Sequence, residues 1–255
     1  MAGMKDAPPM YRGLRKVLPK TLVPYIRMSV EGQENVPADA PVIFAANHLS
    51  FIDSIVLPLS VPRPIYYLAK ADYFESWKTR WFFRAAGCVP TKRDKGQGTG
   101  ALETGVEILK SGDPIGIYPE GTRSPDGRLY RGKTGPVRMA LEAEVPIIPV
   151  GIEGTDKVQP TGTYGVRRHP VTVRLGEPLD LSRYRDQRTD PFALRAATDE
   201  LMFEIMMLSG QEYVDEYASK VKKGEVDVDT VRVEDVQDEP DETIDLTEEE
   251  RRRAG

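Results

Sequence analysis

Short apolar runs rich in β-branched residues alternate along this chain with amphipathic stretches, and this alternation restricts its fold more than any other feature. Runs with the length of buried strands occupy residues 41–46, 65–69, 115–118, 147–152 and 171–175. Apolar residues recur at helical spacing in residues 77–86, 101–109, 133–143 and 192–208. Strands that alternate with helices predict an α/β fold, with a largely parallel central sheet flanked by helices.

One of these runs contains two prolines. Residues 145–152 read Val-Pro-Ile-Ile-Pro-Val-Gly-Ile, with Pro146 and Pro149 inside an otherwise strand-like sequence. Proline has no N–H to donate to a strand ladder, so a central strand seldom contains it. We therefore expect this strand at an edge of the sheet or at a bulge, where it would line an apolar groove.

The composition fits one main domain between two different terminal segments. With 255 residues, 40% of them apolar, the chain can bury a sizeable core, and we place the domain at residues 31–223. Residues 224–255 contain 13 Asp/Glu against 4 Lys/Arg and no aromatic residue, which predicts a disordered acidic tail. Without the tail, 31 Lys/Arg face 27 Asp/Glu, so residues 1–223 carry a net charge of +4.

Residues 1–30 form an N-terminal segment in which basic and apolar side chains are mixed. Arg12, Arg15, Lys16, Lys20 and Arg27 are mixed there with apolar side chains that include Leu14, Val17, Leu18, Leu22, Val23, Tyr25 and Ile26. This composition is typical of a segment that lies on an anionic membrane surface. A helix packed on the domain, with its basic side chains directed to solvent, is the alternative. Pro19 and Pro24 should interrupt any long helix here.

Several classes of protein are disfavoured by the sequence. The single cysteine, Cys88, excludes an intramolecular disulfide and indicates a reducing, cytosolic setting. No group of Cys and His residues has metal-ligand spacing, so we expect no metal. No run approaches the roughly 18 apolar residues of a membrane-spanning helix, and the N-terminus lacks a signal peptide's apolar core. The aromatic residues at 77–83 lack an RNP-like context, so we expect no nucleic-acid partner.

The sequence Asn47-His48-Leu49-Ser50-Phe51-Ile52-Asp53 directly follows the first predicted strand. His48 would emerge at the carboxyl end of that strand, where open α/β sheets place their chemistry. Five residues of continuous helix would turn His48 and Asp53 to different sides, so they can meet only if His48 lies in the turn before a helix. The pair would then be a base with its own carboxylate. Alone, the pattern also fits an ordinary turn histidine with Asp53 as a helix N-cap.

A second polar sequence, Pro119-Glu120-Gly121-Thr122-Arg123-Ser124, follows the run at 115–118. Gly121 permits a tight turn that exposes backbone N–H groups, and Arg123 offers a planar fork of donors that suits a phosphate. Glu120 would hydrogen-bond a substrate hydroxyl or hold the arginine in place. These features predict an anion site, and a surface loop with a Glu–Arg pair is the alternative.

Together and in this order, four segments resemble the glycerophospholipid acyltransferase family, which includes 1-acyl-glycerol-3-phosphate (lysophosphatidate) acyltransferases. The resemblance covers roughly residues 31–180. Its most specific parts are the Asn47-His48-x4-Asp53 segment and, about seventy residues later, residues 119–124. Residues 87–93 and 145–149 match more loosely, and residues from 183 onward match no catalytic segment of the family.

The resemblance implies a role for each matching residue. His48 would be the general base and Asp53 its partner. Glu120, Gly121, Thr122 and Arg123 would form the acyl-acceptor site. Further residues implied by the resemblance are Lys92 and Arg93 as phosphate contacts and Pro149 as part of the wall of the acyl-donor site.

The implied reaction moves a fatty acyl group from acyl-CoA, a co-substrate, to the free hydroxyl of a lysophosphatidate-like lipid, with no cofactor. A backbone N–H near Gly121 or in the turn at His48 would donate to the developing oxyanion. We expect a peripheral protein at the cytoplasmic face of an anionic membrane. Two alternatives remain: an acyltransferase for another lysophospholipid or a glycolipid hydroxyl, and a non-catalytic lipid-binding module.

Overall fold

The computed structural model describes residues 9–69, 87–91, 99–163 and 165–228. Within them, seven strands form one sheet in the order β1-β8-β7-β2-β5-β3-β4. The strands are β1 (Met28–Glu31), β2 (Ile43–Ala46), β3 (Tyr66–Ala69), β4 (Cys88–Pro90), β5 (Ile115–Ile117), β7 (Ile147–Glu153) and β8 (Val171–Leu175). All neighbouring pairs are parallel except β7 and β8, so the predicted α/β fold with a largely parallel sheet is confirmed.

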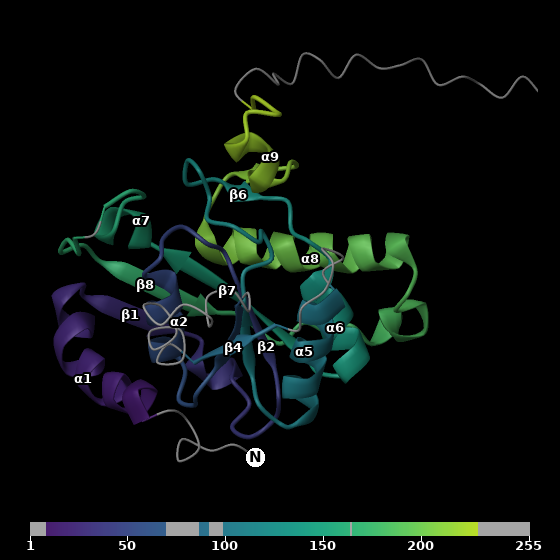
Figure 1. The fold of residues 1–255 in the computed structure, drawn as a ribbon, viewed down its shortest axis with the longest axis horizontal. Coiled ribbons are helices and arrows are strands. Elements are labelled where there is room, and N and C mark those ends of the chain that lie inside the picture. The colour runs from purple at the N-terminus through teal and green to yellow at the C-terminus, as the bar shows by residue number, and fades with distance from the viewer. Residues whose placement is uncertain (1–8, 70–86, 92–98, 164, 229–255) are drawn as a thin grey trace, which may run out of the picture.

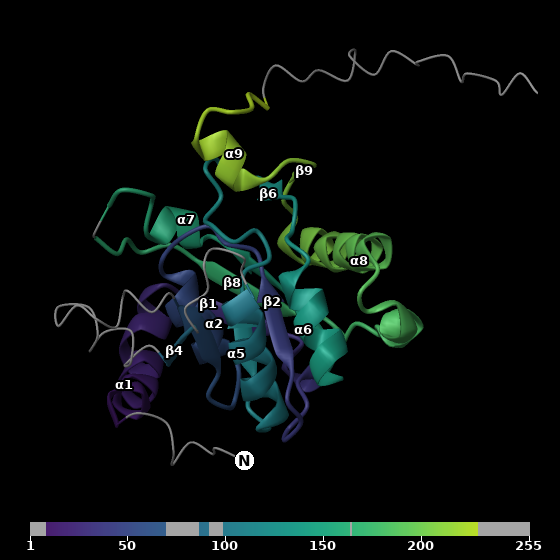
Figure 2. The same cartoon turned by 45° about the vertical axis from the view of Figure 1, so that its right-hand side comes forward.

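Helices cover both faces of this sheet (Figures 1 and 2). The described helices are α1 (Pro9–Tyr25), α2 (Asp53–Ser60), α5 (Thr99–Lys110), α6 (Gly135–Ala143), α7 (Thr155–Val158), α8 (Pro191–Ser209) and α9 (Ala218–Lys222), with 3-10 turns at Gln33–Asn35 and Ser182–Gln187. Of these, α9 stands away from the seven-stranded sheet. One buried cluster joins the sheet to α5, α6 and α8, and a second joins its other face to α1 and α2. A small second sheet pairs β6 (Leu129–Tyr130) with β9 (Tyr213–Val214).

Strand β2 lies at the centre of the fold, where its sequence predicts it. Every side chain of β2 is buried, with Ile43 and Ala45 in one core cluster and Phe44 and Ala46 in the other. Its neighbours are β5 and β7, both parallel to it. The carboxyl ends of these three strands therefore meet at one edge of the sheet, and the segments that follow them share that edge.

The predicted helices and strands that fall on described residues agree with the structure to within a few residues at their ends. The helix predicted at residues 77–86 cannot be compared in this way. That predicted helix lies outside the described residues, as do residues 229–255 of the predicted acidic tail. The sequence did not predict β1, β4, β6 and β9, which have two to four residues each. Strands this short carry too few residues to show an alternating pattern.

The proline-bearing strand, β7, is interior, between β8 and β2, so the prediction of an edge strand is wrong. β8 leaves the regular ladder after Leu175, and one extra residue lies on its side before the next bridge to β7. At this bulge-like irregularity the Gly176 N–H donates to the carbonyl of Pro149 at 2.9 Å. The missing N–H of Pro149 thus falls where the regular pairing has already ended.

Helix α1 is continuous through Pro19 and Pro24, so the predicted interruption is wrong. It packs on α2, with Tyr11 almost fully buried. The Arg15 guanidinium donates to the carbonyls of Pro58, in the last turn of α2, and of Val61 and Arg63, which follow it. These contacts with the domain hold the helix in place although the prolines remove local hydrogen bonds. Among the described helices, none is both long and apolar enough to span a bilayer.

Candidate active site

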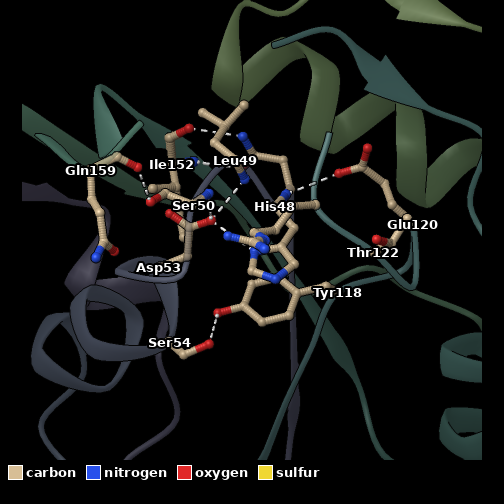
Figure 3. Close-up of polar contacts among 12 residues, drawn as sticks. His48, Leu49, Ser50, Asp53, Ser54, Tyr118, Glu120, Thr122, Ile152 and Gln159 are labelled. Atoms are coloured by element: carbon tan, nitrogen blue, oxygen red, sulfur yellow. Dashed lines mark hydrogen bonds and ion pairs between the residues drawn. The ribbon is translucent and has the colours of Figure 1, made fainter. Parts of the chain in front are cut away.

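His48 lies in the turn between β2 and α2, and its imidazole meets the carboxylate of Asp53. The Nδ1 atom of His48 is 2.8 Å from Oδ2 of Asp53 (Figure 3). The same oxygen accepts hydrogen bonds from the backbone N–H groups of Leu49 at 2.7 Å and Ser50 at 2.8 Å. One fully buried carboxylate therefore fixes both the path of the turn and the orientation of the imidazole. The predicted base–carboxylate geometry is confirmed.

This contact also sets the tautomer of His48. An ionised carboxylate can only accept, so Nδ1 carries the proton and Nε2 is left as the basic nitrogen. The side chain of His48 is 16% exposed, and it lines a cavity of about 600 Å³ at the carboxyl ends of β3 and β5. A basic nitrogen at the wall of a cavity can take a proton from a bound hydroxyl.

Tyr118, directly after β5, packs flat against the imidazole. The two ring centroids are 3.9 Å apart and the ring planes are inclined by 10°. The Tyr118 hydroxyl is 3.2 Å from Oγ of Ser54, on the first turn of α2. The imidazole is thus fixed at its edge by Asp53 and on its face by Tyr118. Sequence reasoning missed this role, although an aromatic residue directly before the 119–124 segment was a visible signal.

Asn47 joins the end of β2 to the end of β7. Its side chain is fully buried, accepts from the N–H of Ile152 at 2.7 Å and donates to the carbonyl of the same residue at 2.8 Å. Its amide also donates to Oε1 of Gln211 at 2.7 Å. These bonds anchor the residue before the base to a neighbouring strand and to the chain that follows α8.

Glu120 does not face the cavity, so its predicted contact with a substrate is wrong. Its side chain is 1% exposed and accepts from the backbone N–H of His48 at 2.9 Å and of Tyr130 at 3.1 Å. No bond joins it to Arg123 within the part of the chain that the structure describes. Burial raises the pKa of Glu120 to about 8, against the lowering effect of its two backbone donors. Glu120 therefore ties the turn of the base to the loop at 119–131.

The next three residues of that loop line the cavity, and their predicted role in binding the acceptor stays a prediction. Gly121 has a φ of +71°, a backbone conformation that favours glycine, and a Cβ there would lie 2.9 Å from Nζ of Lys133. Thr122 and Arg123 follow at the wall. The loop is held from the other side by the Ser124 N–H, which donates to the carbonyl of His48 at 2.7 Å.

Four of the candidate donors for an oxyanion already have partners. The Gly121 N–H donates to the carbonyl of Tyr118, and the N–H groups of His48, Leu49 and Ser50 donate to carboxylates. These four groups satisfy the backbone of the two turns. An oxyanion donor elsewhere near Gly121 stays a prediction.

The cavity combines a cationic part with an apolar part. Its charged lining is Arg123, Lys133 and Arg138, and among the described residues none of these side chains forms an ion pair. The sequence prediction missed Lys133 and Arg138, which only the packing of α6 brings beside the loop. The apolar lining comes from α2, β3, α5 and α6, and includes Phe51, Ile55, Leu68, Leu102 and Met139. Such a cavity fits a molecule with an anionic group and a hydrocarbon chain.

One further predicted site residue, Pro149, lies elsewhere. Pro149 is buried and absent from the cavity lining, so its predicted place in the wall is not borne out. Lys92 and Arg93 lie outside the described residues. Cys88 lines the cavity, where burial raises the pKa of its thiol to about 12, which keeps it protonated and unreactive. No cluster of metal-ligating side chains exists among the described residues.

Comparison with known proteins gives consistent relationships. A sequence model of the Acyltransferase family matches residues 27–153. The chain is 34% identical over 166 residues to a chloroplastic 1-acyl-sn-glycerol-3-phosphate acyltransferase of Arabidopsis thaliana, covering 64% of this chain and 46% of that protein. It is 30% identical over 154 residues to the 1-acyl-sn-glycerol-3-phosphate acyltransferase of Bacillus subtilis (strain 168), covering 60% of this chain and 73% of that protein.

A solved structure shows the same fold. The crystal structure of the 1-acyl-sn-glycerophosphate (LPA) acyltransferase of Thermotoga maritima superimposes with a TM-score of 0.61 at 28% sequence identity. The match covers 78% of this chain and 79% of the Thermotoga chain.

Proposed function

The chain belongs to the acyltransferase family, and on that premise we propose that it transfers a fatty acyl group to the free hydroxyl of 1-acyl-sn-glycerol 3-phosphate, making phosphatidate. One observation carries the proposal. His48, fixed by Asp53, lines a cavity whose wall has an apolar part and three cations that form no ion pair with any residue that the structure describes. A lysophosphatidate has a group for each of these features: a hydroxyl for the base, a phosphate for the cations and an acyl chain for the apolar wall.

In the proposed reaction the acyl donor is a thioester, acyl-CoA. Nε2 of His48 takes the proton of the acceptor hydroxyl as its oxygen bonds to the thioester carbonyl carbon. The carbon–sulfur bond then breaks, and His48 returns the proton to the departing thiolate. Asp53 stabilises the imidazolium between the two transfers, and the stacked Tyr118 keeps the ring in place. A base positioned in this way contributes typically ~10²- to 10⁴-fold in rate.

The acceptor phosphate is proposed to bind at Arg123, Lys133 and Arg138. All three side chains line the same cavity, and a guanidinium group can donate two parallel hydrogen bonds to phosphate oxygens. Lys92 and Arg93 remain predicted contacts of the same kind. The apolar lining beyond them would take the hydrocarbon chain.

We further propose that the enzyme works at an anionic membrane surface, at its cytoplasmic face. On the outer side of α1, the exposed Met10, Leu14 and Val17 fall at helical spacing, with Lys16 and Lys20 exposed beside them. Replacement of both Leu14 and Val17 by Asp should abolish sedimentation with vesicles that contain phosphatidylglycerol. Unchanged sedimentation would refute this part of the proposal.

The reaction is tested with acyl-CoA and lysophosphatidate in steady-state assays. His48→Ala should remove turnover, and Asp53→Asn should lower kcat by about 10²- to 10⁴-fold, because the imidazolium loses its counter-charge. The matched control is His169→Ala, which changes the second histidine of the chain, outside the cavity, and should leave kcat unchanged. Full turnover by a folded His48→Ala protein would refute the assignment of the base.

Recognition of the acceptor is tested separately. Arg123→Met should raise the KM for lysophosphatidate with little effect on the KM for acyl-CoA, since the guanidinium binds only the acceptor phosphate in this scheme. An unchanged acceptor KM would remove Arg123 from the site.

A further inference from the structure

The chain after α8 returns to the edge of the sheet that holds the active site. We call residues 210–222, from the end of α8 through β9 to the end of α9, the C-terminal strap. In Figures 1 and 2 it lies beside β6, above the carboxyl ends of the central strands. It lies beyond the part of the chain that matches the family model.

The strap holds the far side of the loop that begins with Glu120. The Leu129 N–H donates to the carbonyl of Glu212 at 2.8 Å, and the Arg131 N–H donates to the carbonyl of Glu216 at 3.0 Å. Nε2 of Gln211 donates to the carbonyl of Gly127 at 2.6 Å. The loop is therefore fixed between His48 on one side and the strap on the other.

Lys222, the last residue of the strap, reaches the part of the loop that lines the cavity. Its ammonium donates to Oγ1 of Thr122 at 3.0 Å and also to the carbonyl of Arg123. Neither partner carries a negative charge, and Lys222 forms no ion pair among the residues that the structure describes. Burial and the nearby charge of Arg123 lower the pKa of Lys222. The fold thus holds two cations together behind one wall of the cavity.

We propose that Lys222 is a positioning residue for the acceptor phosphate, acting through Thr122 and Arg123; this inference rests on the proposed function. Its bonds fix the backbone that presents the Arg123 guanidinium, and its charge adds to the positive potential at that wall. A phosphate monoester carries close to two negative charges at neutral pH, whereas a phosphodiester carries one. The Lys222–Arg123 pair therefore favours acceptors that end in a phosphate monoester.

The test compares Lys222→Met with Lys222→Arg and with the control Lys223→Met, which removes the neighbouring exposed cation that pairs with Glu225. Lys222→Met should raise the KM for lysophosphatidate about three- to tenfold, a modest effect because the ammonium is partly exposed, with kcat and the KM for acyl-CoA within about twofold. Lys222→Arg should restore most of the acceptor affinity. Lys223→Met should behave as the unmodified enzyme.

A second readout examines the preference for a monoester. Lys222→Met should lower the ratio of kcat/KM for lysophosphatidate to that for lysophosphatidylcholine, which a general loss of folding would not change. Equal acceptor KM values in Lys222→Met and Lys223→Met, or an unchanged ratio, would overturn the proposal.

Failure of the proposed function gives a different result. In that case the unmodified protein transfers no acyl group to any lysophospholipid. Equilibrium dialysis then measures the binding of glycerol 3-phosphate to the full chain. This measurement decides the role of Lys222 without turnover. Weaker binding by Lys222→Met than by Lys223→Met would support it, and equal binding would overturn it.

Discussion

Replacing Glu120 with glutamine tests how a buried carboxylate joins the two halves of the active site. In the enzyme both carboxylate oxygens accept from backbone N–H groups, of His48 and Tyr130. Glutamine offers one oxygen and one amide nitrogen, so one of these N–H groups would face another donor. An unsatisfied buried donor costs about 1–3 kcal/mol. The substitution should therefore destabilise the protein wherever Glu120 is protonated.

The pKa of Glu120 gives this substitution a dependence on pH. Burial raises the pKa from 4.5 to about 8, so the folded protein binds this proton more tightly than the unfolded chain does. The resulting stability is fully present below pH 4.5 and is lost as the pH rises through about 8. At about 1.4 kcal/mol for each tenfold change in affinity, the loss between pH 5 and pH 9 is about 4 kcal/mol. Glutamine does not titrate and lacks this loss.

The stability curves of the two proteins should therefore cross. With a mid-range cost for the lost acceptor, Glu120→Gln is less stable by about 1 kcal/mol at pH 5 and more stable by about 3 kcal/mol at pH 9. Urea unfolding followed by far-UV circular dichroism at pH 5, 7 and 9 measures these differences. Glu142→Gln, which changes an exposed glutamate on α6, is the matched control. A difference between Glu120→Gln and the unmodified protein that stays constant from pH 5 to pH 9 would refute the reasoning.

Three further changes probe the residues around the base. Asn47→Ala should lower the free energy of unfolding by about 2–4 kcal/mol, since it removes two buried hydrogen bonds to Ile152; urea unfolding measures this, and a loss below about 1 kcal/mol would contradict it. Tyr118→Leu should reduce kcat several-fold while Tyr118→Phe retains it, because the stacked ring holds His48; equal losses in steady-state assays would assign the effect to the hydroxyl. At pH 8, Cys88 should be alkylated by iodoacetamide far more slowly than glutathione, because a thiol with a pKa of about 12 is ionised in only about one molecule in ten thousand. Mass spectrometry follows the alkylation, and comparable rates for Cys88 and glutathione would contradict the burial of the thiol.

The parts of the site that sequence predicted well are local. His48 and Asp53 are five residues apart, and a strand followed by a turn and a helix leaves few ways to place them. The contact between the two side chains was therefore predicted, and in the structure Nδ1 of His48 lies 2.8 Å from Oδ2 of Asp53. The sequence also predicted an anion site at Gly121 and Arg123, and in the structure both residues line the cavity. Their polar turn follows a parallel strand, and open α/β sheets bind ligands at the carboxyl ends of such strands.

The parts that sequence missed depend on contacts between distant segments. Glu120 binds two backbone N–H groups, and every residue except proline has such a group. The partners of Glu120 therefore cannot be recognised from the side chains in the sequence. Pro149 is tolerated in an interior strand only because β8 leaves the ladder beside it. The stacking of Tyr118 on His48 requires β2 and β5 to be neighbours, a fact of strand order that periodicity does not give.

The double attachment of the loop at 119–131 also sets the order in which the site can be completed. His48 and Asp53 leave the ribosome together, but Glu120, which binds His48, follows 72 residues later, and Lys222 follows Thr122 by a further 100. Because proteins are synthesised from the N-terminus, a nascent chain has its base long before it can have a fixed loop. The acceptor side of the site is therefore completed only after Lys222 has been made.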